Sequence, residues 1–162
     1  MSLNIRIIRS LSDLDKYRKD WNRLYDKYGI SVSQSFDFTL SAFRYNLKQN
    51  SGTSTFIVLF YEKNDLICIF PFIKRKNNIH KSIEGSPDGD DCEFLLSSDQ
   101  YVIRIVKSFR KFIIKESLNV YINNIESSSL FVKYFEYNHK NLFFSYINSE
   151  KIKISLDNKQ NN

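Results

Sequence analysis

Glycine, proline and cysteine are scarce in this chain of 162 residues, which contains four glycines, two prolines and two cysteines. Two cysteines cannot build the disulfide framework that stabilises many small secreted domains. Phosphate-binding loops place several glycines close to the start of a helix, and the sequence contains neither Gly-x-x-x-x-Gly-Lys-Ser/Thr nor Gly-x-Gly-x-x-Gly. These absences argue against a disulfide scaffold and against the common nucleotide-binding motifs.

Long apolar runs are also absent. The first residues, Met-Ser-Leu-Asn-Ile-Arg, contain no apolar segment of the ~7–15 residues that a signal peptide needs. The run from Leu66 to Ile73 is far shorter than the ~20 residues of a membrane-spanning helix. We therefore expect a protein without a membrane span, located in the reducing cytoplasm.

Charge does not identify a partner by itself. The formal net charge is +6, but the Lys and Arg residues are spread along the chain rather than gathered in one block. A chain rich in Lys, Asn, Ile, Phe and Tyr is typical of a compositionally biased genome, and this reading is favoured over a nucleic-acid surface. With 42% hydrophobic residues, the chain has the composition of a globular domain.

Apolar periodicity predicts three helices. The first begins near Asp13, with Ser12 as its N-cap, and runs to Gly29 at the C′ position. The second runs from Phe36 to about Asn50, and the third covers roughly residues 101–113 with Lys and Arg on its outer face. A short helix through Phe135, capped within residues 127–129, is a fourth candidate.

Continuous apolar and β-branched runs predict the strands. Residues 55–61 and 66–73 are separated by a polar turn and should form an antiparallel hairpin, with Pro71 near a strand end or a sheet edge. Further strands are expected at residues 5–8, 118–122, 143–147 and 152–156. The fold class is therefore α/β, with a mixed, largely antiparallel sheet flanked by helices, in a single domain over residues 1–156 followed by a polar tail at 157–162.

Catalytic and metal-binding residues are not evident. His80 and His139 are isolated and favour surface roles, so no metal site can be drawn and no catalytic residue is assigned. Asp88, Asp91 and Glu93 belong to one acidic segment, for which a solvated loop is favoured over a metal site. Carboxylates can also orient an amine or accept its proton, so this segment remains a candidate for substrate binding.

Several short motifs, taken in order, resemble the N-terminal region of the GNAT-type proteins of the CelD-like and FemAB-like groups. The resemblance covers roughly residues 5–125 and rests on these segments: Trp21-Asn22-Arg23-Leu24; Ser33-Gln34-Ser35-Phe36-Asp37-Phe38; Pro71-Phe72-Ile73-Lys74-Arg75-Lys76; and Gly85-Ser86-Pro87 with Asp91-Cys92-Glu93. Phe38 stands where the family usually has Trp, and Cys92 where it usually has Tyr.

The resemblance implies the N-terminal half of an acyltransferase-like protein, here a truncated or half domain. In that family a second GNAT-like half carries the acyl-CoA site, and the first half helps to line the acceptor cleft. Gln34, Ser35, Asp88, Asp91 and Glu93 are the implied substrate-binding residues, for a small-molecule, sugar or amine acceptor. No cofactor-binding residue is expected in this chain, so an acyl donor would come only with a second half, and the chain could be a fragment, a split-gene partner or a remnant.

Three functions follow as hypotheses. The first is an acceptor-side domain of an N-acyltransferase, inactive alone. The second is a non-catalytic interaction module, paired with a second GNAT-like half or with another copy of itself through sheet edges or exposed aromatic surface. The third, less favoured, is a nucleic-acid-binding face made by Lys74, Arg75, Lys76, Lys81, Arg104, Lys107, Arg110 and Lys111.

Overall fold

A single mixed sheet organises the chain. The computed structural model describes residues 3–81, 94–126, 128–138, 142–146 and 151–156. Its main elements, in chain order, are β1 (Asn4–Ile8), α1 (Leu11–Leu14), α2 (Arg18–Tyr28), α3 (Phe36–Gln49), β2 (Thr53–Glu62), β3 (Asp65–Arg75), β4 (Asn78–Lys81), β5 (Leu95–Leu96), α4 (Val102–Lys115), β6 (Asn119–Glu126), α5 (Leu130–Asn138), β7 (Leu142–Tyr146) and β8 (Lys151–Leu156).

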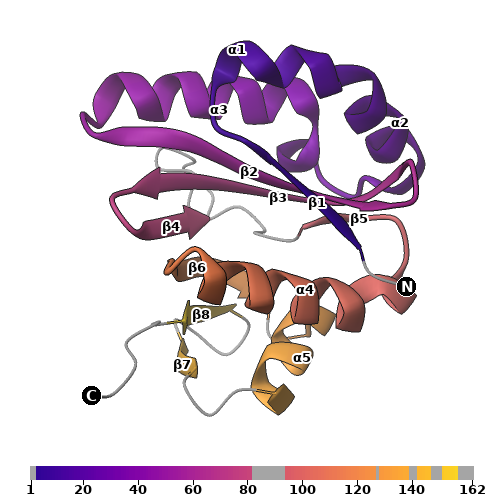
Figure 1. Ribbon diagram of the computed structural model, residues 1–162, viewed down its shortest axis with the longest axis vertical. Coiled ribbons are helices and arrows are strands. Elements are labelled where there is room, and N and C mark those ends of the chain that lie inside the picture. The colour runs from indigo at the N-terminus through magenta and orange to yellow at the C-terminus, as the bar shows by residue number, and fades with distance from the viewer. Residues whose placement is uncertain (1–2, 82–93, 127, 139–141, 147–150, 157–162) are drawn as a thin grey trace.

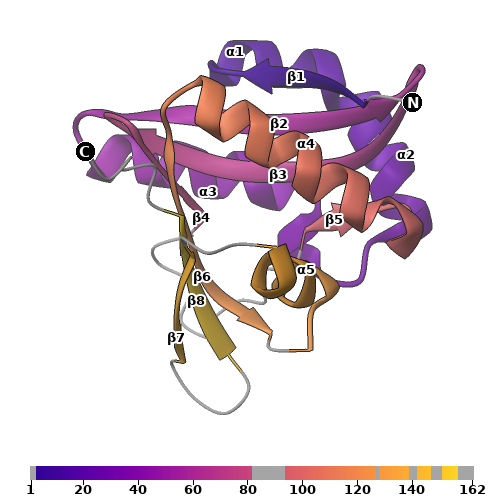
Figure 2. The ribbon, with the colours of Figure 1, turned by 60° about the horizontal axis from the view of Figure 1, so that its bottom comes forward.

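The strands follow the order β1-β2-β3-β4-β6-β8-β7, and β5 pairs with β3 beside this path. Every described pair is antiparallel except β4 with β6, which run parallel. The predicted mixed, largely antiparallel sheet is therefore confirmed, as are the hairpin of β2 and β3 and the two closing strands. Figures 1 and 2 show the sheet between two layers of helices.

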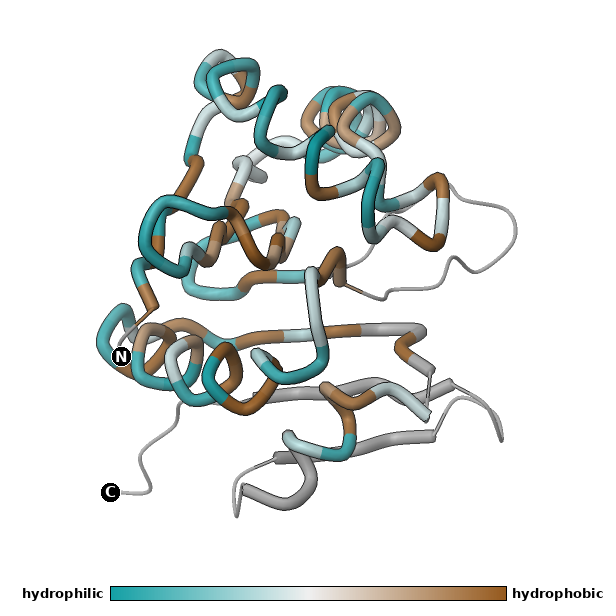
Figure 3. The backbone as a smooth tube through the Cα atoms, turned by 90° about the vertical axis from the view of Figure 1, so that its right-hand side faces the viewer, coloured by the Kyte–Doolittle hydropathy of each residue, from teal (hydrophilic) through white to brown (hydrophobic). Residues whose placement is uncertain are grey.

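The two faces of β2 and β3 carry separate hydrophobic cores. On one face, α1, α2 and α3 cover Ile57, Leu59 and Ile69 with side chains that include Trp21 and Phe36. On the other face, α4 and α5 cover a core rich in phenylalanine. In Figure 3, hydrophobic and hydrophilic colours alternate along the helical turns on either side of the sheet. Burial on both faces explains why these strands are continuous apolar runs in the sequence.

Phe70 lies at the centre of the second core. Its ring stacks on Phe94 at a centroid distance of 3.8 Å and contacts Phe109 of α4 edge-to-face at 5.1 Å. It also meets Phe131 of α5 at 5.4 Å and Phe60 of β2 at 4.9 Å. One fully buried side chain thus joins β2 and β3 to both helices of this layer.

The first helix departs from its prediction at its start. Ser10, not Ser12, is the N-cap of α1, because the Ser10 hydroxyl accepts a hydrogen bond from the Ser12 amide. A 3-10 turn over Asp15–Tyr17 then separates α1 from α2. Both serines fit the local capping pattern, so the sequence alone does not distinguish them. The direction in which the chain leaves β1 selects Ser10, two positions before the predicted cap.

Pro71 was expected near a strand end or at a sheet edge, and this prediction was wrong. Pro71 lies inside β3, opposite Ile57 of β2, and β3 has neighbours on both sides. On the side away from β2, however, β5 pairs with Cys68 and Ile69 and β4 pairs with residues 73–75. Pro71 falls between these two paired segments, where a missing N–H costs no ladder hydrogen bond.

No helix in the part of the chain described above is long and apolar enough to cross a membrane.

Replacement of Phe70 by alanine should lower the free energy of unfolding by about 3–5 kcal/mol, because it empties the centre of the aromatic core. Urea denaturation followed by circular dichroism measures the loss. Tyr45→Ala is the matched control, since that ring is 52% exposed and its removal should cost well under about 1 kcal/mol. Similar losses for both variants would contradict the central role of Phe70.

Candidate functional site

The connector between α2 and α3 is held rigid by Gln34. The Gln34 side chain is buried, and its Oε1 accepts hydrogen bonds from the amides of Ile30, at 2.9 Å, and Ser31, at 3.4 Å. In return, Ser31 caps the 3-10 turn over Val32–Gln34 and completes a capping box. The backbone carbonyl of Gln34 accepts from the indole Nε1 of the buried Trp21 at 2.9 Å.

Gly29 joins α2 to this connector through a close approach. Its φ of −66° and ψ of 133° are open to any residue, so the glycine is not required by backbone conformation as the C′ prediction supposed. A Cβ built on Gly29 would instead lie 2.7 Å from the Tyr25 carbonyl oxygen and 2.3 Å from the Tyr25 ring. The absent side chain lets the connector turn tightly against the end of α2.

Two apolar side chains of this rigid connector point into solvent. Ile30 is 80% exposed and Val32 is 67% exposed, and Tyr28 at the end of α2 is also exposed. Single exposed apolar residues are ordinary, but three within five positions, two of them on a connector fixed by internal hydrogen bonds, form an exposed apolar surface. We call Tyr28, Ile30 and Val32 the apolar rim.

A cavity of about 400 Å³ includes Tyr28 of the apolar rim in its lining. Its wall is polar and comes from the end of α2, the start of β3 and the segment that leads into α4; the lining residues are Arg23, Leu24, Lys27, Tyr28, Asp65, Leu66, Ile67, Ser97, Ser98, Gln100 and Tyr101. Arg23 lies 3.4 Å from Asp20 and 3.9 Å from Asp65. Among the described residues, the Ser97 hydroxyl is buried without a hydrogen-bond partner, which is costly unless a ligand or water supplies one.

The start of α4 binds a carboxylate of the chain itself. Tyr101 donates its hydroxyl to Glu62 Oε2, and Arg104 donates to Glu62 Oε1, both at 2.6 Å. The amide of Tyr101 donates to the Ser98 carbonyl, and that of Ser97 donates to the Ile67 carbonyl. Asp99 adds a second carboxylate in the turn that precedes the helix. The first turn of α4 is thus already paired with a negative group.

These contacts shift two ionisation equilibria. The hydrogen bond from Tyr101, followed by that from Arg104, holds the pKa of the Glu62 carboxyl below its ordinary value of 4.5. The same bond to Glu62 raises the pKa of Tyr101 above its ordinary value of 10.0. Glu62 is therefore ionised and Tyr101 protonated at neutral pH, which preserves the pair.

Of the residues implied by the family resemblance, Gln34 and Ser35 lie in the described part of the chain. Both side chains accept hydrogen bonds from backbone amides. Gln34 belongs to the capping box of the connector, and the Ser35 hydroxyl accepts from the Phe38 amide at the start of α3. Asp88, Asp91 and Glu93 lie outside the described residues. Their role in substrate binding stays a prediction.

Sequence reasoning missed the cavity residues Arg23, Lys27 and Ser97 and the apolar rim. Ile30 and Val32 flank Ser31 between the first two predicted helices, and two β-branched residues there were the available signal. No group of three or more His, Cys, Asp or Glu side chains that could hold a metal occurs among the residues with assigned positions.

The arrangement of strands and helices is that of the GNAT N-acetyltransferase fold. The structure is similar to a probable acetyltransferase of the GNAT family from Chromobacterium violaceum, with a TM-score of 0.57 and 8% identity over 98% of this chain and 88% of that one. It is also similar to a putative GNAT acetyltransferase from Desulfovibrio desulfuricans (TM-score 0.53, 9% identity, 96% of this chain and 100% of that one). A third similar structure is Campylobacter jejuni N-acetyltransferase PseH in complex with acetyl coenzyme A (TM-score 0.51, 11% identity, 95% and 99%).

No protein-family profile matches the sequence, and no curated protein matches it.

The structural similarity corrects the expectation of a half domain. The matches extend over nearly the whole of this chain and over whole GNAT structures, including one with bound acetyl coenzyme A. The chain therefore spans a GNAT fold rather than part of one, and nothing in the comparisons points to the CelD-like or FemAB-like groups. The short motifs suggested the right fold but the wrong extent, because local motifs contain no information on where the sheet closes.

Glu62 should make the stability of the folded chain depend on pH in the acidic range. Because its pKa is lower in the folded state, its stabilising contribution is present above pH 4.5 and is lost as the pH falls through the folded value. Glu62→Gln should therefore flatten the fall in melting temperature on acidification below that pH, measured by differential scanning fluorimetry. Asp26→Asn, an exposed carboxylate of α2, is the control and should leave the acid dependence as in the wild type. An unchanged profile for Glu62→Gln would refute the assignment.

Proposed function

We propose that this chain acts on the acceptor side of an N-acyl transfer reaction, binding a small amine that carries an anionic group and an apolar part, while the acyl donor is bound elsewhere. The observation that supports it is the cavity that Tyr28 of the apolar rim helps to line, in a chain with the GNAT fold. The fold supports the reaction class, and the side chains around the cavity support the kind of acceptor.

The cavity offers complementary groups for such a molecule. Arg23 and Lys27 provide positive charge for a carboxylate or phosphate, and Asp65 can face an amine. Ser97, Ser98 and Gln100 add further polar residues to the lining. Tyr28 belongs to both the cavity wall and the apolar rim. An apolar substituent that extends out of the cavity over Tyr28 can therefore rest on Ile30 and Val32 while the charged groups of the acceptor stay inside.

The start of α4 does not fit the diphosphate of an acyl-CoA. Such a site needs free amides at a helix start and a backbone without bulky side chains. Residues 97–104 contain no glycine, and their first turn already binds Glu62. Glu62 and Asp99 would both repel a diphosphate. A separate GNAT-fold protein or another copy of the chain would then supply the donor.

A partner docked on the apolar rim is the second candidate function. The high exposure of Ile30 and Val32 favours it, because a rigid apolar surface also suits a protein contact. This interaction module needs no ligand in the adjacent cavity, which separates it from the acceptor function.

Acetyl-CoA should not bind the purified chain. Isothermal titration calorimetry should show no saturable binding up to about 1 mM, because the start of α4 has neither glycine nor a free anion site. Asp99→Asn removes one repelling carboxylate but leaves the turn unchanged, so it should behave in the same way. Micromolar binding by the wild type would overturn the donor part of the proposal.

A model acceptor should bind the cavity. In a titration of the isotope-labelled chain followed by NMR, free phenylalanine should shift the amides of Tyr28, Ser97 and Ser98 more than phenylalaninamide, which lacks the carboxylate. The double variant Ile30→Ser/Val32→Ser should weaken binding by about 3–10-fold through lost apolar contact.

The control for this titration is Ile103→Ser/Ile114→Ser, which removes two exposed isoleucines of α4 away from the cavity. It should bind the probe as the wild type does. Equal weakening by both double variants, or shifts that do not involve the cavity, would contradict the acceptor proposal. A rim variant that dissociates a dimer without changing probe binding would favour the interaction module.

A further inference from the structure

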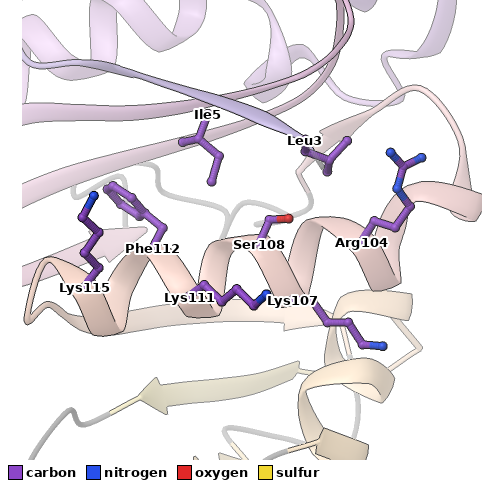
Figure 4. A pocket seen from close by; sticks show the side chains of 8 residues that line it. All are labelled: Leu3, Ile5, Arg104, Lys107, Ser108, Lys111, Phe112 and Lys115. Atoms are coloured by element: carbon purple, nitrogen blue, oxygen red, sulfur yellow. The ribbon is translucent and has the colours of Figure 1, made fainter. Parts of the chain in front are cut away.

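A second hollow lies between the edge strand β1 and α4. It encloses about 460 Å³ and is lined by Leu3, Ile5, Arg104, Lys107, Ser108, Lys111, Phe112 and Lys115. Figure 4 shows Leu3 and Ile5 pointing from β1 toward α4, where Phe112 faces Ile5. We call this hollow the β1–α4 groove; it has an apolar floor and a basic wall.

The basic wall is a regular row. Lys107, Lys111 and Lys115 recur every fourth residue of α4 and are all exposed. Within the residues that the structure describes, none of the three forms an ion pair with a carboxylate. Arg104 continues the row toward the helix start but is paired with Glu62. Three unneutralised charges on one helix face attract an anionic partner.

The other wall is an open sheet edge. β1 is the terminal strand of the sheet and pairs only with β2 among the described strands, so its outer backbone groups have no strand partner there. β1 and α4 lie side by side in the same direction, since Leu3 lies near Ser108 and Arg9 pairs with Glu116 at 3.6 Å. An open edge of this kind can accept a further strand.

The spacing of the lysines fits an extended chain. Residues four apart on a helix are about 6 Å apart along its axis. Side chains on one face of a strand recur every second residue, at about 6.6–6.8 Å. The spacing of alternate side chains on a strand added to β1 would therefore match the spacing of Lys107, Lys111 and Lys115 over three positions.

We propose that the β1–α4 groove binds an acidic peptide segment in extended conformation, which adds to the open edge of β1 and places alternate carboxylates against Lys107, Lys111 and Lys115. Backbone hydrogen bonds to β1 supply the docking, and the lysine row supplies the selectivity. The apolar floor of Leu3, Ile5 and Phe112 receives aliphatic parts of the peptide. Nucleic acid uses neither the strand edge nor the apolar floor, so a peptide fits the groove better.

A synthetic heptapeptide tests the proposal. It carries glutamate at its second, fourth and sixth positions and valine or threonine between them, with both ends blocked and a fluorophore attached. Fluorescence anisotropy at low salt should show saturable binding to the full chain that weakens as salt rises. Lys107→Glu/Lys111→Glu should reduce the affinity at least tenfold.

Two controls keep the result interpretable. Arg110→Glu/Lys133→Glu makes the same change in net charge at exposed residues outside the groove and should bind as the wild type does. A peptide N-methylated at alternate backbone positions keeps its charges but cannot form a ladder, so it should lose most of its affinity.

Three results would overturn the proposal. The first is equal weakening by both double variants, which indicates only general charge attraction. The second is full affinity of the N-methylated peptide, which excludes strand addition. The third is tighter binding of an oligothymidylate of ten nucleotides than of the peptide, in competition with the labelled probe, which indicates a nucleic-acid surface instead.

Discussion

The packing of Phe70 against Phe94, Phe109 and Phe131 is the contact on which the rest of the structure depends. It fixes α4 and α5 on the sheet, and α4 with the segment that leads into it contributes to both hollows described above. The segment that leads into α4 forms one wall of the polar cavity, and the basic side of α4 forms one wall of the β1–α4 groove. A shift of this helix would therefore change two surfaces at once, so the aromatic core preorganises both.

A second constraint is the hydrogen bonding of the polar groups in the connector after α2. Gln34, Ser31 and Trp21 satisfy one another through local hydrogen bonds, which leaves Ile30 and Val32 exposed on a rigid backbone. In a flexible segment these apolar side chains would turn inward or collapse on neighbouring surface. Ordering a backbone segment costs conformational entropy, and here the exposed side chains of Ile30 and Val32 recover none of that cost by burial. Such a segment favours contact with another molecule.

The sequence predicts the elements well and the site poorly, for a physical reason. Helix and strand periods are local, so α4, the hairpin of β2 and β3 and the closing strands could all be derived from spacing. The cavity joins Arg23, Asp65 and Ser97, which lie far apart in the chain and have no shared pattern. Pro71 shows the same limit, because its tolerance inside β3 depends on the gap between β4 and β5 rather than on its neighbours in sequence.

The charges of α4 connect the two proposed surfaces. Its first turn is neutralised internally, since Glu62 accepts from Tyr101 and Arg104, whereas Lys107, Lys111 and Lys115 are left to solvent. A helix start paired with an internal carboxylate has less positive potential to offer a diphosphate. The pairing does not extend to the basic side: Glu62 engages Arg104, and the three lysines beyond it have no carboxylate partner in the part of the chain that the structure describes. The same internal ion pair thus argues against donor binding at one end of α4 while the adjacent face remains available to an anionic partner.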